Sequence, residues 1–150
     1  MIKLERKTEE TEIDLKFELY GKGEYQIDTG IGFFDHMLES FTRHGFFDLE
    51  VNVDGDLEVD YHHTVEDTAI LLGKAIKKEL GNNTGIKRFG QILMPMDEIL
   101  ISCAVDISGR SYYRDNLEFY SDRAGDFPAE LAAEFFRSIT SNSEINLHFY

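Results

Sequence analysis

The chain has 150 residues, enough for one ordinary domain with a core and little more. Fifteen lysines and arginines against 29 acidic residues leave a formal charge of −14, which disfavours nucleic-acid binding because the chain would repel a phosphate backbone. No apolar run is long enough to cross a bilayer, the charged first residues do not resemble a secretory signal, and one cysteine cannot form an intrachain disulfide, so we expect a soluble cytoplasmic protein with no membrane partner.

The first half of the chain begins with a clear strand pattern. Apolar and charged residues alternate from Glu12 to Tyr20, which is typical of a half-buried strand. A short stretch through Ile27 follows. The apolar residues after Gly32 then recur on one helix face, and Gly45 is a plausible stop, so a helix is predicted between these two glycines.

A second strand and a second helix complete the first half. Alternation returns from Phe47 to Val53, and the pair Asp54-Gly55 predicts a hairpin turn into a short strand through residues 57–59. Thr64 is expected to cap a helix that ends near Leu80, with an acidic residue three positions after the cap.

The second half repeats this order, so the chain is interpreted as a duplication. Residues 98–107 alternate like a strand, residues 112–120 are expected to pair with them, Pro128 opens a helix, and residues 143–150 form a last strand. The second helix of the first half has no counterpart. Because this would leave a bare strand edge and an uncovered sheet face, we expect that residues beyond Tyr150 are missing.

The adjacent pair His62-His63 is a candidate metal site. Neighbouring side chains point in different directions, so each imidazole would face its own ion. Glu66 follows at spacings that share a helix face with either histidine, and imidazole with carboxylate suits Mn, Fe, Zn or Ni. Polar residues that cap a helix or face solvent explain the same pattern. If the site is real, these residues should gather near His36.

The remaining histidines lie away from the predicted core faces. His36 lies beside the apolar stripe of the first helix, His44 precedes a glycine where the helix dipole favours a cation, and His148 lies on the strand face opposite Leu147. Each position also suits an ordinary exposed residue. Arg88 and Arg110 lie in glycine-marked loops where a small anion could be clamped, and we expect them to approach one another, although loop solubility explains them equally well.

Taken together, five segments resemble imidazoleglycerol-phosphate dehydratases in order and spacing: DTGIGFFDHML (28–38), DYHHTVED (60–67), RFG (88–90), PMDE (95–98) and DISGR (106–110). The resemblance runs from Arg6 to His148. This chain has Tyr61 where the family usually carries Asp, and Ser111 where it carries Pro. The family's second His-His-x-x-Glu motif and the lysine after it would lie beyond Tyr150.

The resemblance implies an α+β fold of two duplicated ββαβα-type halves, about 1–85 and about 86–150, with sheets packed on helices and the second half lacking its last helix. It also implies a homo-oligomer of 24 subunits with two Mn²⁺ ions per site at subunit interfaces. The ligands present here would be His36, His62, His63, Glu66 and His148. These cannot fill two octahedral shells, so the absent motif, substrate and water would supply the rest.

The implied activity is that of a hydro-lyase of histidine biosynthesis, which removes water from imidazole glycerol phosphate to give imidazole acetol phosphate. The hydrogen to be removed is not acidic, so the reaction needs an electron sink, which a metal-bound substrate imidazole would provide. The resemblance implies that Glu10 handles protons and contacts the substrate, and that Asp97 assists Glu10 in catalysis. It also implies contacts to the substrate or its phosphate from His44, Arg88 and Arg110.

A non-catalytic interpretation stays open, namely a truncated subunit or a self-associating interaction module whose histidines are surface residues. We expect a chain that ends at Tyr150 to be inactive as a dehydratase, because it lacks the second motif. A gene that continues into a second His-His-x-x-Glu segment would favour the enzyme.

Overall fold

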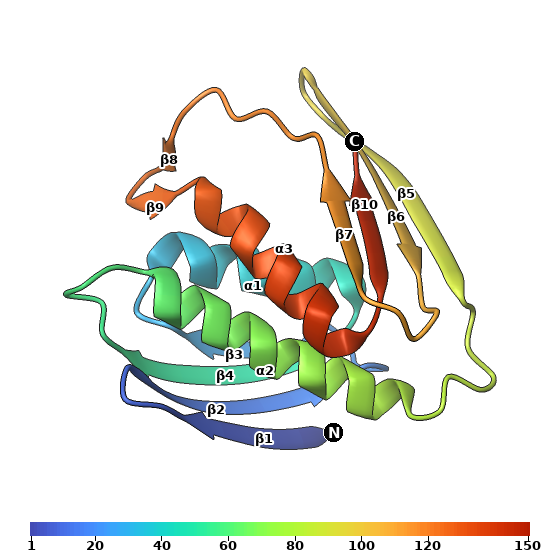
Figure 1. Ribbon diagram of the computed structural model, residues 1–150, viewed down its shortest axis with the longest axis horizontal. Coiled ribbons are helices and arrows are strands. Elements are labelled where there is room, and N and C mark those ends of the chain that lie inside the picture. Colours follow the sequence, from blue (N-terminus) through green and yellow to red (C-terminus); the bar gives the residue numbers. More distant parts are fainter.

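Two four-stranded sheets lie on either side of three helices in the computed structural model, which describes residues 1–150 (Figure 1). The first sheet has the order β1-β2-β4-β3, made of β1 (Ile2–Lys7), β2 (Thr11–Glu18), β3 (Tyr25–Asp28) and β4 (Asp48–Gly55). The second has the order β5-β6-β10-β7, made of β5 (Phe89–Met96), β6 (Ile99–Asp106), β7 (Tyr112–Asp115) and β10 (Asn146–Phe149). The helices are α1 (Gly32–Gly45), α2 (His62–Leu80) and α3 (Glu130–Ser143), and β8 (Arg123–Ala124) pairs with β9 (Phe127–Pro128).

The predicted α+β duplication is confirmed by the strand pairing. In each sheet the first three neighbours are antiparallel and the last pair is parallel, β3 with β4 in one and β7 with β10 in the other. Helices α1 and α3 occupy equivalent places, and both end at a non-glycine residue in the left-handed conformation, Phe46 (φ 56°) and Glu144 (φ 57°). No helix among the three has the length and apolar composition that a membrane crossing requires.

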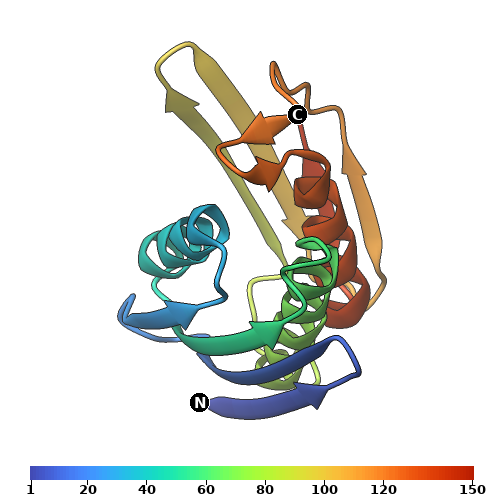
Figure 2. The ribbon, with the colours of Figure 1, turned by 90° about the vertical axis from the view of Figure 1, so that its left-hand side faces the viewer.

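The core lies between the first sheet and the helices. The inward face of β2 contributes Ile13, Leu15 and Phe17, which are at most 2% exposed. Figure 2 shows α2 and α3 between the two sheets. Their backbones approach closely at Gly73, where an added Cβ would lie 2.6 Å from the carbonyl oxygen of Ile139. The second sheet has no equivalent of α2, and an apolar hollow of about 640 Å³ lies between α1, α3 and β6.

The hairpin predicted after β4 is wrong. Residues 57–59 form a turn, in which the Val59 amide donates to the carbonyl of Asp56 at 2.8 Å. Because β4 already lies between β2 and β3, neither of its edges is free to pair with a returning strand. Gly55 is required instead by a close approach, since an added Cβ would lie 2.2 Å from Thr64 Oγ1.

The start of α2 also differs from the prediction. Thr64 does not cap the helix, which begins at His62, and the Asp60 carboxylate accepts a hydrogen bond from the His62 amide at 2.7 Å. Thr64 is fully buried in the first turn. The acidic residue expected to support the cap, Asp67, lies in the next turn and bonds Arg6 and Thr11.

In the second half, the segment 112–120 does not pair with residues 98–107. Only Tyr112–Asp115 forms a strand, and it pairs with β10, because β5 and β10 occupy both edges of β6. Strands β1 and β5 were not predicted. Every residue of β5 is exposed and the strand contains Pro95, so its sequence has no clear alternation, which suits an edge strand. Helix α3 begins two residues after Pro128.

Candidate active-site residues

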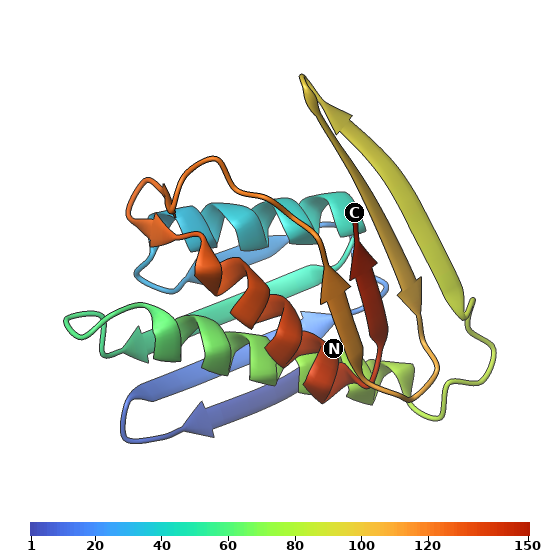
Figure 3. The ribbon, with the colours of Figure 1, turned by 45° about the horizontal axis from the view of Figure 1, so that its top comes forward.

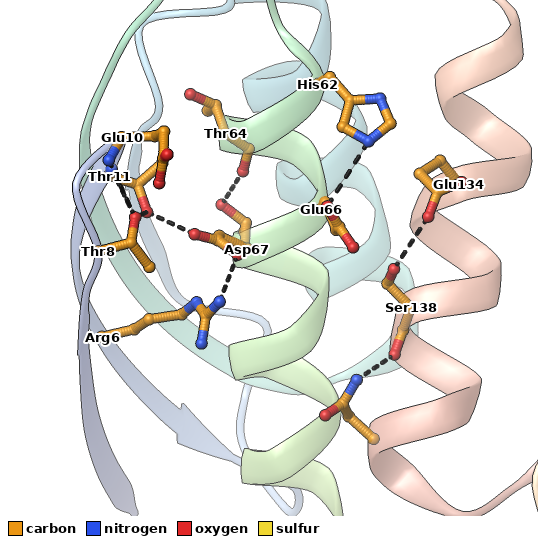
Figure 4. A network of polar contacts seen from close by, with 12 residues as sticks. Arg6, Thr8, Glu10, Thr11, His62, Thr64, Glu66, Asp67, Glu134 and Ser138 are labelled. Atoms are coloured by element: carbon orange, nitrogen blue, oxygen red, sulfur yellow. Dashed lines mark hydrogen bonds and ion pairs between the residues drawn. The ribbon is translucent and has the colours of Figure 1, made fainter.

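His62 and Glu66 form an imidazole–carboxylate pair within the first turns of α2. One helical turn separates them, which brings His62 Nε2 to 3.5 Å from Glu66 Oε2 (Figure 4). Their side chains are 45% and 36% exposed, so both remain accessible to an ion or substrate. Two donors from one helix can form one side of a metal site but not a complete coordination shell.

His63 contacts a different carboxylate from His62. The two rings lie at 87° to one another, with centroids 6.1 Å apart, and His63 Nδ1 lies 2.8 Å from Asp56 Oδ2. This hydrogen bond raises the pKa of His63 above its ordinary value, the negative charges of Asp56, Glu10 and Asp60 add to the effect, and partial burial opposes it. The imidazoles of His62 and His63 therefore interact with different carboxylates, Glu66 and Asp56.

The turn between β1 and β2 carries Glu10 next to the start of α2. Thr8 Oγ1 accepts hydrogen bonds from the amides of Glu10 (3.1 Å) and Thr11 (2.9 Å), which hold the turn in shape. The carbonyl of Glu10 accepts a hydrogen bond from the Asp56 amide at 3.1 Å. Because the Glu10 charge contributes to the pKa of His63, its exposed carboxylate lies within electrostatic reach of that ring.

A polar network centred on Asp67 joins strands β1 and β2 to helix α2 beneath the Glu10 turn, as Figure 4 shows. Asp67 is 7% exposed. It accepts a hydrogen bond from Thr11 Oγ1 at 2.6 Å and forms an ion pair with Arg6, whose Nη2 lies 2.8 Å away. Arg6, Thr11 and Asp56 were not among the residues predicted to form the site. A signal was available for Asp67, a carboxylate on the helix face that otherwise buries Thr64, Val65, Thr68 and Ala69.

The other two predicted metal ligands, His36 and His148, and the predicted substrate contact His44 lie elsewhere. His36 and His44 are exposed on α1, and His148 is on β10, where its Nδ1 lies 3.3 Å from the Tyr150 hydroxyl. No group of three or more metal-ligating side chains forms within one chain. The gathering of His62 and His63 near His36 therefore stays a prediction for an assembly of chains.

Arg88 and His148 share the outer face of the second sheet. Arg88 makes a two-pronged contact with Asp106, with Nε 2.6 Å from Oδ1 and Nη2 3.1 Å from Oδ2. His148 pairs in register with Ala104, two residues before Asp106, so the two side chains lie on the same face. Arg88 holds the pKa of Asp106 below its ordinary value, and the charge of Arg110 contributes, so both arginines lie near this carboxylate.

Asp97 lies apart from the other candidates. It adopts a left-handed conformation (φ 50°) in the turn that joins β5 to β6. Figure 3 shows this hairpin projecting beyond the helices, away from the start of α2. Within one chain Asp97 therefore does not reach Glu10 or the His62–Glu66 pair.

Comparisons with known proteins agree on one family. Residues 29–150 match the model of the family described as imidazoleglycerol-phosphate dehydratase. The chain is 54% identical over 143 residues to the imidazoleglycerol-phosphate dehydratase of Clostridium novyi (95% of this chain, 73% of the relative), and 50% identical over 146 residues to that of Methanosarcina mazei (97% and 76%).

Solved structures give the same result. The crystal structure of imidazoleglycerol-phosphate dehydratase from Staphylococcus aureus superposes with a TM-score of 0.85 at 31% identity, covering 99% of this chain and 83% of that one. The corresponding values for IGPD from Pyrococcus furiosus are 0.83 and 30%, covering 97% and 77%.

Proposed function

The chain belongs to the imidazoleglycerol-phosphate dehydratase family, and from this premise we propose that its working site is built around Mn²⁺ by more than one chain. Its function is the dehydration of imidazole glycerol phosphate in histidine biosynthesis, the reaction of a hydro-lyase. The metal, the assembly and the roles of individual residues are the parts we propose.

The donor set at the start of α2 supports the metal. Imidazole and carboxylate together suit a divalent transition ion such as Mn²⁺, and His62 with Glu66 supplies both on one helix face. His63 presents a second imidazole in another direction, as two ions per site would need. His36 and His148 would contribute two further imidazoles from neighbouring chains, without filling either shell.

The separation of the candidate residues within one chain supports a shared site. Glu10, His62 and Glu66 lie at the start of α2, whereas Arg88 follows the loop after its end. A helix of 19 residues is about 28 Å long, too far for both groups to contact one small substrate. We propose that the outer face of the second sheet, with Arg88 and His148, meets the start of α2 from another chain.

The outer faces of the two sheets support this assembly. In the first sheet the outer positions are charged or polar, for example Glu5, Asp14 and Glu50. In the second, the outer positions Phe89, Leu93 and Leu100 are 60%, 63% and 59% exposed. Exposed apolar residues gathered on one face mark an interaction surface. We propose a homo-oligomer, with 24 chains as its expected size.

Each residue then has a chemical role. When bound, the metal would make the substrate's imidazole ring a better electron acceptor. Glu10 would donate a proton to the C3 hydroxyl, which leaves as water, and would take the proton from C2. Arg88 and Arg110 would hold the phosphate through paired N–H donors. Arg88 would exchange its contact with Asp106 for the phosphate. From neighbouring chains, His44 would contact the substrate and Asp97 would assist Glu10.

We also propose that the protein works in the cytoplasm. Cys103 is a free, partly buried thiol whose pKa is raised by burial, which favours its unreactive protonated form, and a reducing compartment would keep it in that state.

The test is to assay the protein expressed from its own gene for imidazole acetol phosphate formation, before and after EDTA treatment and with Mn²⁺ restored. We expect EDTA to abolish turnover and Mn²⁺ to restore it. His62→Ala and Glu66→Gln should lower both Mn²⁺ affinity and turnover, whereas Glu58→Gln, in the exposed turn before α2, should change neither. Full turnover in the metal-free protein would overturn the role of the metal.

Self-association without catalysis is the second candidate, and the exposed apolar face of the second sheet is the observation that favours it. A folded, assembled protein with bound Mn²⁺ and no turnover would support that alternative.

A further inference from the structure

We propose that Asp56 is a positioning residue that holds His63 by Nδ1 and leaves Nε2 free to bind the metal. This inference rests on the proposed metal site and assigns a role to a residue outside the predicted ligand set.

The hydrogen bond between Asp56 and His63 determines which ring nitrogen is free. Asp56 Oδ2 lies 2.8 Å from His63 Nδ1, and an ionised carboxylate can only accept, so Nδ1 carries the hydrogen. In the neutral ring, Nε2 then has the lone pair that a metal ion requires. A carboxylate that bonds the second nitrogen of a ligating histidine both orients the ring and strengthens it as a ligand.

The surroundings of Asp56 keep its carboxylate in place. The backbone amide of Asp56 donates to the Glu10 carbonyl at 3.1 Å, and its carbonyl accepts from the Val59 amide at 2.8 Å. The side chain is 18% exposed, and Oδ1 is buried without a hydrogen-bond partner. Because an unpartnered buried carboxylate oxygen is unfavourable, the direction of this side chain is not explained by stability alone.

The same contacts connect two parts of the site. The turn that carries Glu10 is bonded to the backbone of Asp56, and the ring of His63 is bonded to its side chain. A single residue directly after β4 therefore links the turn that carries Glu10 to an imidazole at the start of α2.

An exposed ion pair without a positioning role is the simpler interpretation, because the His63 side chain is 42% exposed. The two interpretations differ in what an amide would do at this position. Asn at position 56 keeps an oxygen that can accept from Nδ1 but has no charge, whereas Ala removes the acceptor. A positioning role predicts that Asn preserves much of the metal affinity that Ala loses.

The experiment compares Asp56→Ala, Asp56→Asn and the matched control Asp54→Ala, an exposed carboxylate two residues earlier, in β4. Mn²⁺ affinity is measured on the assembled protein from the electron paramagnetic resonance signal of free Mn²⁺. We expect Asp56→Ala to weaken Mn²⁺ binding by about 10- to 100-fold. Asp56→Asn should weaken it less, and Asp54→Ala should leave it unchanged.

A metal-free measurement keeps the inference testable if Asp56→Ala does not fold. Solid-state ¹⁵N NMR of histidine-labelled, sedimented wild-type protein in EDTA reports which ring nitrogen carries the hydrogen, with His63 assigned by its loss in His63→Gln. We expect a hydrogen on Nδ1 in the wild type. A neutral ring with its hydrogen on Nε2 would overturn the inference, and so would Asp56→Ala with wild-type Mn²⁺ affinity.

The outcomes also separate this inference from the proposed function. Wild-type protein that binds no Mn²⁺, or His63→Gln with unchanged affinity, would overturn the metal role of His63 and this inference with it. Weakened binding in His63→Gln together with unchanged binding in Asp56→Ala would overturn this inference alone.

Discussion

The Arg6 guanidinium and the Asp67 carboxylate join strand β1 to helix α2 through an ion pair in which Nη2 lies 2.8 Å from Oδ1 (Figure 4). The other oxygen of Asp67 accepts a hydrogen bond from Thr11, so both are used. The pair lies beneath the turn that carries Glu10. In the sequence, Asp67 directly follows Glu66. The geometry of the pair therefore controls how the turn and the helix sit relative to one another.

Removal of Asp67 should destabilise the fold. Asp67→Ala leaves the partly buried charge of Arg6 without a partner, and we expect the free energy of unfolding to fall by about 3 kcal/mol. Urea unfolding followed by circular dichroism measures this change. The control is Lys7→Ala, which removes the exposed Lys7–Glu12 pair on the same strand and should lower the free energy of unfolding far less, because solvent screens an exposed pair. Equal losses in the two variants would contradict the structural importance of the buried pair.

Close packing of α2 on α3 should make Gly73 intolerant of a side chain. An added Cβ would meet the backbone carbonyl of Ile139 at 2.6 Å, and a backbone atom cannot rotate away. We expect Gly73→Ala to lower the free energy of unfolding by about 1–3 kcal/mol. Gly32→Ala is the control, because no atom lies within 4 Å of its added Cβ. Since alanine favours a helix, that variant should be neutral or slightly more stable.

Arg88 should control the ionisation of Asp106. The hydrogen bonds and charge of Arg88 lower the pKa of Asp106, so Arg88→Gln should raise that pKa toward its ordinary value. The stabilisation from this pair is present above the pKa of the unfolded chain, about 3.9, and is lost as the pH falls through the lower folded value. Carboxyl ¹³C shifts of labelled aspartates measure the pKa. Lys87→Gln, which alters the adjacent exposed cation, should leave it nearly unchanged, and an unmoved Asp106 pKa in Arg88→Gln would contradict the pairing.

The outer face of the second sheet should be necessary for assembly. Leu93→Glu with Leu100→Glu places two charges among the exposed apolar residues of this face, and their desolvation would oppose contact with another chain. We expect sedimentation velocity to show smaller particles than the wild type. Lys3→Glu, on the polar outer face of the first sheet, should not change the particle size. An unchanged assembly in the double variant would show that the interface lies elsewhere.

Elements with local signals were predictable from the sequence. Alternation from Glu12 to Tyr20 and from 98 to 107 located β2 and β6, because successive side chains of a strand face opposite sides. The spacing of His62 and Glu66 placed both on one face of α2, because four residues make about one helical turn. The repeated order of elements also indicated the duplication, and the motifs identified the family.

The relations between distant segments depend on packing and were not predictable from the sequence. A hairpin after Gly55 was reasonable from a turn signal, but β2 and β3 occupy both edges of β4, and sheet order is not encoded in neighbouring residues. The bonds of Asp67 with Arg6 and Thr11 join residues more than 50 positions apart, and the direction of the Asp56 side chain follows from where β4 ends beside α2. Local periodicity follows from backbone geometry within a few residues, whereas these contacts depend on how whole strands and helices are ordered and packed.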